Sequence, residues 1–159
     1  MEFEDGASHN SAKSPVRFVL LLHTLPDAAP QSTHWDLMIC QGDSLLTFAL
    51  QSLPPQTREA SGLIWPATRL PDHRLNYLEY EGVIAPAQPG GADRGSVRRV
   101  AAGWAVCEVD PQAAQSHRWR LSSPQLQAVF AYTPCAVGAS TQLLIESWNV
   151  IESRNAAES

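Results

Sequence analysis

Short runs in which apolar and polar residues alternate dominate the chain, and such runs are typical of β-strands. In the segment HWDLMIC, residues 34–40, the side chains of His34, Asp36 and Met38 would share one face of a strand. Trp35 and its alternating neighbours would share the other face. One face therefore begins with an imidazole and a carboxylate, whereas the opposite face is apolar.

Further segments with strand character follow at short intervals, separated by clusters of Gly, Pro, Asp and Ser. They cover residues 17–23, 34–40, 45–50, 77–85, 96–100, 104–109, 117–121, 127–133 and 142–148. We expect a proline-rich, irregular connection over residues 53–72 and a brief helical turn over residues 110–115. Many short strands at regular spacing predict an all-β, mainly antiparallel fold: a compact single-domain β-barrel with long loops and little helix.

The two ends of the chain are polar and lack periodicity. We expect residues 1–15 to be a disordered tail, residues 16–150 to form the barrel domain, and residues 151–159 to be a polar C-terminal tail. A chain of 159 residues, 44% hydrophobic and 17% charged, suits one domain. No apolar run approaches the roughly 20 residues that span a bilayer, and the N-terminus has no signal-like segment. We therefore expect a cytoplasmic protein without a membrane partner.

Cysteine usage and charge narrow the chemistry. Cys40, Cys107 and Cys135 are far apart and include no CxxC pair, so we expect neither a disulfide framework nor a cysteine zinc site. The net charge is -5, with a pI near 5.4. This balance argues against binding of nucleic acid through bulk electrostatics. Any contact with nucleic-acid phosphates must therefore be local.

His23, His34 and Asp36 are the candidate metal ligands. His23 ends the first predicted strand and the other two begin the next, so the three side chains meet if these strands are neighbours. Two imidazoles and one carboxylate suit manganese, iron or zinc better than magnesium. The same residues also fit a half-buried histidine, a loop histidine and a surface aspartate that never meet. Spacing alone favours this second interpretation.

His73 and Tyr77 form a second candidate pair. A spacing of four in a helix or turn places both on one side. An imidazole beside a phenol can bind a phosphate oxygen or transfer a proton. The alternative is a solvent-facing loop histidine next to a tyrosine of the core.

The order of these polar landmarks resembles a known family. The succession FVLLLH, HWDLM, TFALQSLP, DHRLNYLEYEGVIA, GSV, WRL and QLLIESWN, over residues 17–149, is similar to the 3'-phosphoesterase domain of bacterial DNA ligase D. The most specific match is HRLNYLEYEG at residues 73–82, and the next is HWD at residues 34–36. The resemblance covers most of the chain.

The resemblance implies a β-barrel that removes a 3'-phosphate or 3'-ribonucleotide from DNA primer ends. The expected cofactor is a divalent metal, with Mn²⁺ as first choice and Zn²⁺ or another transition metal as alternatives. His23, His34 and Asp36 match the family's metal ligands. His73 and Tyr77 match residues that act at the phosphate, so we expect them to be catalytic. Any ligase or polymerase that acts beside this domain in DNA repair is expected to be a separate protein.

The chain departs from the family at three places where the family carries charge. Met38 stands in the position of an arginine, Gln51 or Ser52 in that of a lysine, and Pro71 in that of an acidic residue. Loss of a preorganised charged donor commonly lowers a rate by roughly 100- to 1000-fold. Arginines of nearby loops are candidates to replace it: Arg69, Arg74, Arg94 and Arg98.

Three functions follow from these features. The first is a divalent-metal-dependent 3'-phosphoesterase that acts on DNA or RNA ends, and it is the one we expect. The second is a catalytically weak module that binds a nucleic-acid end or a repair partner, consistent with the missing charged residues. The third is a phosphoesterase for a small molecule, consistent with the acidic charge balance.

Overall fold

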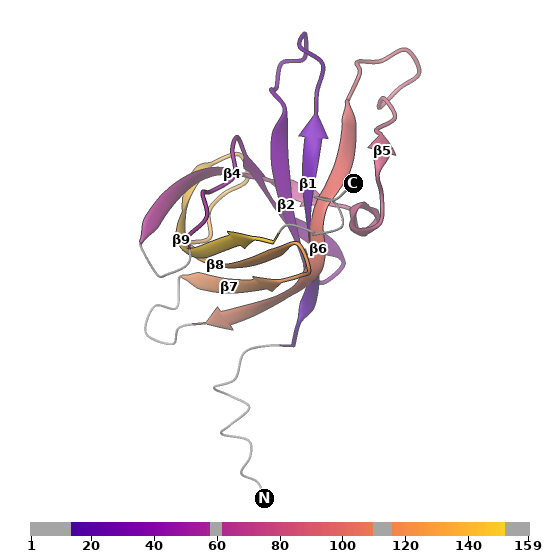
Figure 1. Ribbon diagram of the computed structural model, residues 1–159. Helices are drawn as coiled ribbons and strands as arrows, with labels where there is room; N and C mark the ends of the chain where they lie inside the picture. The colour runs from indigo at the N-terminus through magenta and orange to yellow at the C-terminus, as the bar shows by residue number, and fades with distance from the viewer. Residues whose placement is uncertain (1–13, 58–61, 110–115, 152–159) are drawn as a thin grey trace, which may run out of the picture.

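A single antiparallel sheet that closes on itself forms the protein. The computed structural model describes residues 14–57, 62–109 and 116–151. In these residues, nine strands follow the order β1-β2-β3-β4-β9-β8-β7-β6-β5, and the pairing of β1 with β6 closes eight of them into a barrel (Figure 1). β5 is an additional strand on β6. The predicted all-β, mainly antiparallel, single-domain barrel is confirmed.

The strands differ in length, and one short 3-10 helix, η1, follows β4. Their bounds are β1 (Val16–Thr24), β2 (His34–Gln41), β3 (Ser44–Leu50), β4 (Leu63–His73), η1 (Leu75–Leu78), β5 (Gly82–Val83), β6 (Ser96–Val109), β7 (His117–Ser122), β8 (Leu126–Tyr132) and β9 (Ser140–Val150). Most predicted strands therefore begin and end within a few residues of the observed ones.

The barrel interior is filled by alternate residues of its strands. Phe48, Phe130 and Trp148 are among the largest of these side chains and are fully buried. Trp35 of β2 packs against the same cluster from its rim. Because side chains alternate along a strand, the neighbours of these residues face outward.

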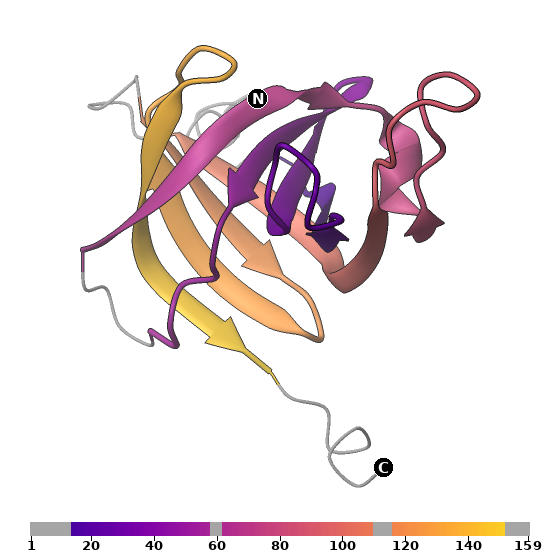
Figure 2. The same cartoon turned by 90° about the horizontal axis from the view of Figure 1, so that it is seen from above.

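A second apolar cluster covers the outer face of β1, β2 and β6. Leu78 of η1 and Ile84 after β5 belong to this outer cluster, so the chain between β4 and β6 folds over that face. Seen from above, η1 and the segment after β5 lie on the side of β1 and β2 away from β7, β8 and β9 (Figure 2). Its buried members are Val19, Leu21, Met38, Leu45, Leu78, Ile84 and Val97.

The expected irregular connection over residues 53–72 is wrong in its second half, which belongs to β4. Pro66 pairs with β9 before the pairing of β4 with β3 begins at Thr68, and Pro71 lies at an irregularity of the β3–β4 ladder. Pro66 lies where β4 is paired on one edge only, and Pro71 lies where the ladder is interrupted, so neither has to supply an N–H to the β3–β4 ladder. A strand can therefore pass through both positions.

Two other strand predictions are also wrong. Residues 77–85 form a helical turn and the short β5 instead of one strand, because Leu78 and Ile84 both reach the outer cluster. Residues 96–100 and 104–109 are parts of the single strand β6, which pairs first with β1 and then with β7. The small residues between them resemble a break in the sequence. A side chain at Gly103 would overlap the carbonyl oxygen of Ser122, so close packing requires glycine there.

Three predictions fall wholly or mainly outside the described residues. They are the disordered tail at residues 1–15, of which only 14 and 15 are described, the helical turn at residues 110–115, and the polar tail at residues 151–159, of which only 151 is described. The described part of the chain contains no helix that is long and apolar enough to cross a bilayer.

The two clusters predict different responses to truncation. We expect Leu78→Ala to lower the free energy of unfolding by about 2 kcal/mol and Phe48→Ala by about 3–5 kcal/mol, because Phe48 leaves the larger cavity. Hydrogen exchange should rise only near residues 75–84 in Leu78→Ala and throughout the barrel in Phe48→Ala. An equal rise throughout the barrel in both variants would contradict the separation of the clusters.

Candidate active site

The pairing of β1 with β2 places the three candidate metal ligands together. His23 lies directly opposite His34, and Asp36 lies opposite Leu21. Cross-strand partners share a face of a sheet, so these side chains point to the same side as Leu21 of the outer cluster. The predicted ligands therefore lie outside the barrel interior, on the end of the β1–β2 pair.

The three side chains converge closely. The ring centroids of His23 and His34 are 5.0 Å apart in an edge-to-face arrangement. Asp36 Oδ2 lies 3.5 Å from His23 Nδ1, and Asp36 Oδ1 lies 3.1 Å from His34 Nε2. One ligand atom from each residue lies within 4.8 Å of the other two. The side chain of Asp36 is 3% exposed and that of His23 is 17% exposed, so the group is shielded but reachable.

The outward ring nitrogens are held by main-chain carbonyls. His23 Nε2 donates to the carbonyl of Arg94 at 2.9 Å, and His34 Nδ1 donates to the carbonyl of Ser32 at 2.8 Å. A carbonyl can only accept, so these bonds assign the proton to the outward nitrogen of each neutral ring. The inward nitrogens then carry lone pairs. Metal-binding histidines are commonly oriented in this way.

The buried carboxylate lacks a compensating donor. Although Asp36 Oδ1 lies 3.1 Å from His34 Nε2, it accepts no hydrogen bond of good geometry. A carboxylate oxygen and two imidazole lone pairs thus face one small space, which is unfavourable without a proton or a cation. Two nitrogen ligands and one oxygen ligand, with room for further ligands, fit a divalent transition metal.

A proton competes with a cation for this space. The contact with Asp36 raises the pKa of His34, against the effect of burial. Burial by itself raises the pKa of Asp36, but the contacts with His23 and His34 outweigh it and hold that pKa below its usual value. Asp36 is therefore ionised, and a metal that binds the ring of His34 has to compete with a proton there.

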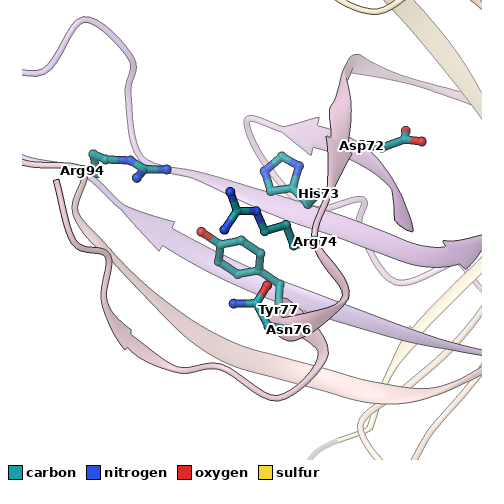
Figure 3. Close-up of a pocket in the computed structure, with 6 residues that line it drawn as sticks. All are labelled: Asp72, His73, Arg74, Asn76, Tyr77 and Arg94. Carbon is teal, nitrogen blue, oxygen red and sulfur yellow. The ribbon is translucent and has the colours of Figure 1, made fainter. Parts of the chain in front are cut away.

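His73 and Tyr77, the second predicted pair, also come together. Their ring centroids are 5.5 Å apart, and both line a cavity of about 300 Å³ with Asp72, Arg74, Asn76 and Arg94 (Figure 3). His73 Nδ1 donates to the carbonyl of Pro71 at 2.8 Å, which leaves Nε2 for a ligand. The arrangement provides an imidazole and a phenol on one cavity wall.

The metal-ligand group adjoins one cavity directly and is linked to a second one through Arg94. His34 itself lines a second cavity, of about 280 Å³, together with the neutral side chains of Gln51 and Thr68. The cavity of His73 and Tyr77 is lined by Arg94, whose carbonyl holds His23. His34 therefore borders a cavity directly, whereas His23 is linked to the other cavity only through Arg94.

The departures from the family pattern have definite positions. Met38 is buried in the outer cluster, Gln51 lines the cavity at His34, and the carbonyl of Pro71 holds His73.

Glu81 accepts a hydrogen bond from the backbone N–H of Arg99 at 2.7 Å, beside the irregularity in the β1–β6 ladder. Its role is therefore structural.

Some residues that shape the site carry no signal in the sequence. Ser32 and Arg94 orient His34 and His23 through main-chain carbonyls, which every residue possesses. The sequence did predict that loop arginines lie near the phosphate site, but it did not show which of the four candidates do so. Arg74 and Arg94 line the cavity of His73 and Tyr77, whereas Arg69 and Arg98 do not.

Comparison with known proteins identifies no family for this chain, so the interpretation of the site depends on the contacts described above. No protein-family model matches the chain, and no curated protein has a significantly similar sequence. The resemblance to the phosphoesterase domain therefore remains an expectation drawn from motifs.

We expect the protein to bind Mn²⁺ and both His34→Ala and Asp36→Asn to weaken that binding by more than about 100-fold, because each variant removes a ligand. Isothermal titration calorimetry measures the affinities. Asp43→Asn, which removes an exposed carboxylate from the β2–β3 turn, is the matched control and should bind as the wild type does. Unchanged affinity in the first two variants would contradict the ligand assignment.

Metal affinity should depend on pH. Because the pKa of His34 is raised, a proton competes with Mn²⁺ for this ring at a higher pH than for an ordinary histidine. On acidification below that pKa, the Mn²⁺ affinity should fall by about tenfold per pH unit. Titrations between about pH 6 and pH 8, in buffers of different ionisation enthalpy, also report the released proton. Constant affinity over this range would show that no proton is displaced.

Gly95→Ala should weaken Mn²⁺ binding by about tenfold, the effect typical of a lost partner behind a metal ligand. Gly95 has φ +80°, and a Cβ there would overlap the carbonyl oxygen of Thr24. The chain would have to move, and the carbonyl of Arg94 would move away from His23. Gly90→Ala is the matched control, because Gly90 has φ +75° but no atom within 4 Å of the added carbon. Equal affinity in both variants would argue against a role for this contact.

Proposed function

We propose that the protein is a divalent-metal-dependent phosphoesterase that removes a phosphate group from the 3' end of DNA or RNA. The observation that carries this proposal is the convergence of His23, His34 and Asp36 within 4.8 Å, on the same face as the cavity that contains His73 and Tyr77. Its motifs also resemble those of the 3'-phosphoesterase domain, in which the matching positions have these roles.

The strands provide a rigid support for the three ligands. His34 and Asp36 are buried on one strand and His23 is paired to them from the next, so little reorganisation is needed to form the site. A bound divalent ion would supply Lewis-acid stabilisation of the negative charge on the phosphoryl oxygens. Asp36 contributes the negative charge that favours a cation there, while both imidazoles remain neutral ligands.

His73 and Tyr77 have roles in binding and proton transfer. The hydroxyl of Tyr77 can donate a hydrogen bond to a phosphoryl oxygen. With Nδ1 held by Pro71, protonated His73 can deliver the proton on Nε2 to the departing 3' oxygen. Water adds to phosphorus, the bond from phosphorus to the 3' oxygen breaks, and the products are a 3'-hydroxyl end and inorganic phosphate.

The proposed substrate class follows from the size and charge of the site. A cavity of about 300 Å³ suits a terminal phosphate with its sugar, and the protein's net charge of -5 favours contact with a strand end over contact along a duplex. The product end is the form that a ligase joins or a polymerase extends. A small phosphate ester would use the same chemistry.

A 3'-phosphorylated DNA primer is the test substrate. With Mn²⁺ we expect release of phosphate, a loss of more than about 100-fold in His34→Ala, and a loss of about 10- to 100-fold in Tyr77→Phe without a change in Mn²⁺ affinity. A 5'-phosphorylated primer and an aryl phosphate are the comparison substrates.

The comparison substrates decide between the alternatives. Equal turnover of the aryl phosphate would favour a small-molecule esterase. No release by folded protein with Mn²⁺ or Zn²⁺ bound would contradict the enzymatic proposal and favour a module that binds strand ends.

A further inference from the structure

The cavity of His73 and Tyr77 holds two arginines that have no acidic partner. Among the described residues, four arginines form ion pairs with carboxylates: Arg17, Arg69, Arg118 and Arg120. Arg74 and Arg94 form none, and both line this cavity. Unpaired guanidinium groups in a protein with a net charge of -5 are candidates for binding an anion.

The cavity presents positive charge to its interior. Figure 3 shows the guanidinium groups of Arg74 and Arg94 directed toward the space beside the Tyr77 hydroxyl. Asp72, the one acidic residue of the lining, points away from that space and accepts hydrogen bonds from Arg69 Nη2 at 2.9 Å and Ser44 Oγ at 3.0 Å. Its charge is therefore already compensated.

The side chain of Arg94 is held in place from its own loop. Arg94 Nη1 donates to the carbonyl of Ala85 at 3.0 Å, and the N–H of Gly95 donates to Asp93 Oδ1 at 2.8 Å. The N–H of Ile84 also donates to the carbonyl of Gly95 at 2.9 Å. A guanidinium that is ordered before binding loses little conformational freedom when it accepts a ligand.

We propose that Arg94 binds the substrate phosphate with its guanidinium while its main-chain carbonyl orients the metal ligand His23, so that one residue joins the anion cavity to the metal site. This inference rests on the proposed function, and it names the cationic residue of the phosphate site. Arg74 supplies a second positive charge on the same cavity. Arg94 takes the role that an arginine at position 38 has in the family, since Met38 is buried in the outer cluster.

The connection has a thermodynamic consequence. An anion held by Arg94 restrains the segment that positions His23, and a cation on His23 restrains the same segment. Each ion should therefore increase the affinity for the other, by the same factor. The part of this coupling that depends on Arg94 disappears when its guanidinium is removed.

Binding of Mn²⁺ and inorganic phosphate, measured separately and together by calorimetry, tests the inference without turnover. We expect Arg94→Met to weaken phosphate binding by about 10- to 100-fold and to reduce the effect of phosphate on Mn²⁺ affinity. Mn²⁺ affinity without phosphate should stay within about twofold of wild type, because the variant keeps the carbonyl. Arg94→Lys should recover part of the phosphate affinity.

Arg98→Met is the matched control, because Arg98 is exposed on β6 and lines no described cavity. Wild-type phosphate affinity in Arg94→Met that still binds Mn²⁺ would overturn this inference alone. Weaker Mn²⁺ binding in Arg94→Met without phosphate would also overturn it, since the side chain would then only support the loop. Failure of the wild-type protein to bind Mn²⁺ would overturn the proposed function as well.

Discussion

The register between β1 and β2 is the constraint on which the candidate site depends. Residues on a strand alternate between two faces, so a shift of one residue would turn His34 and Asp36 into the barrel interior and bring Trp35 out. The apolar residues on both faces prevent such a shift: Leu37 must lie inside the barrel and Met38 in the outer cluster. Packing of the two apolar clusters therefore holds His23, His34 and Asp36 in place, although these three residues belong to neither cluster.

Burial of Asp36 in this position is tolerable only with compensation. A carboxylate that is 2% exposed has lost nearly all of its hydration, and removal of one partner from a buried charge is strongly destabilising. A proton on His34 or a divalent cation would supply that compensation. The main-chain carbonyls behind both histidine rings prevent the rings from turning away, because they orient the inward nitrogens toward the carboxylate instead of toward solvent.

Local alternation was enough to predict the barrel and most strands, because each depends on which face of a strand a residue occupies. The meeting of His23 with His34 and Asp36 was expected only from the resemblance to the phosphoesterase domain, since spacing alone favoured side chains that never meet. β4 was missed because proline is a poor guide to a strand that pairs with a different neighbour on each half. The role of Arg94 was also beyond the sequence. Its segment lies at the end of β1 because Ser96 pairs with Thr24 and Gly95 closely approaches the same residue, and a contact between distant segments leaves no periodic pattern.

The proposed site divides its tasks between two kinds of structure. Paired strands hold the metal ligands, whereas η1 and the segment that ends at Gly95 carry the groups for the phosphate. Connections tolerate substitution better than paired strands do, because fewer buried contacts depend on them. A charged contact can therefore pass from a strand position such as Met38 to a loop position such as Arg94 without disturbing the ligands on β1 and β2. Under the proposed function, Arg94 supplies from a loop the positive charge that an arginine at position 38 would supply from a strand, while Met38 packs in the outer cluster.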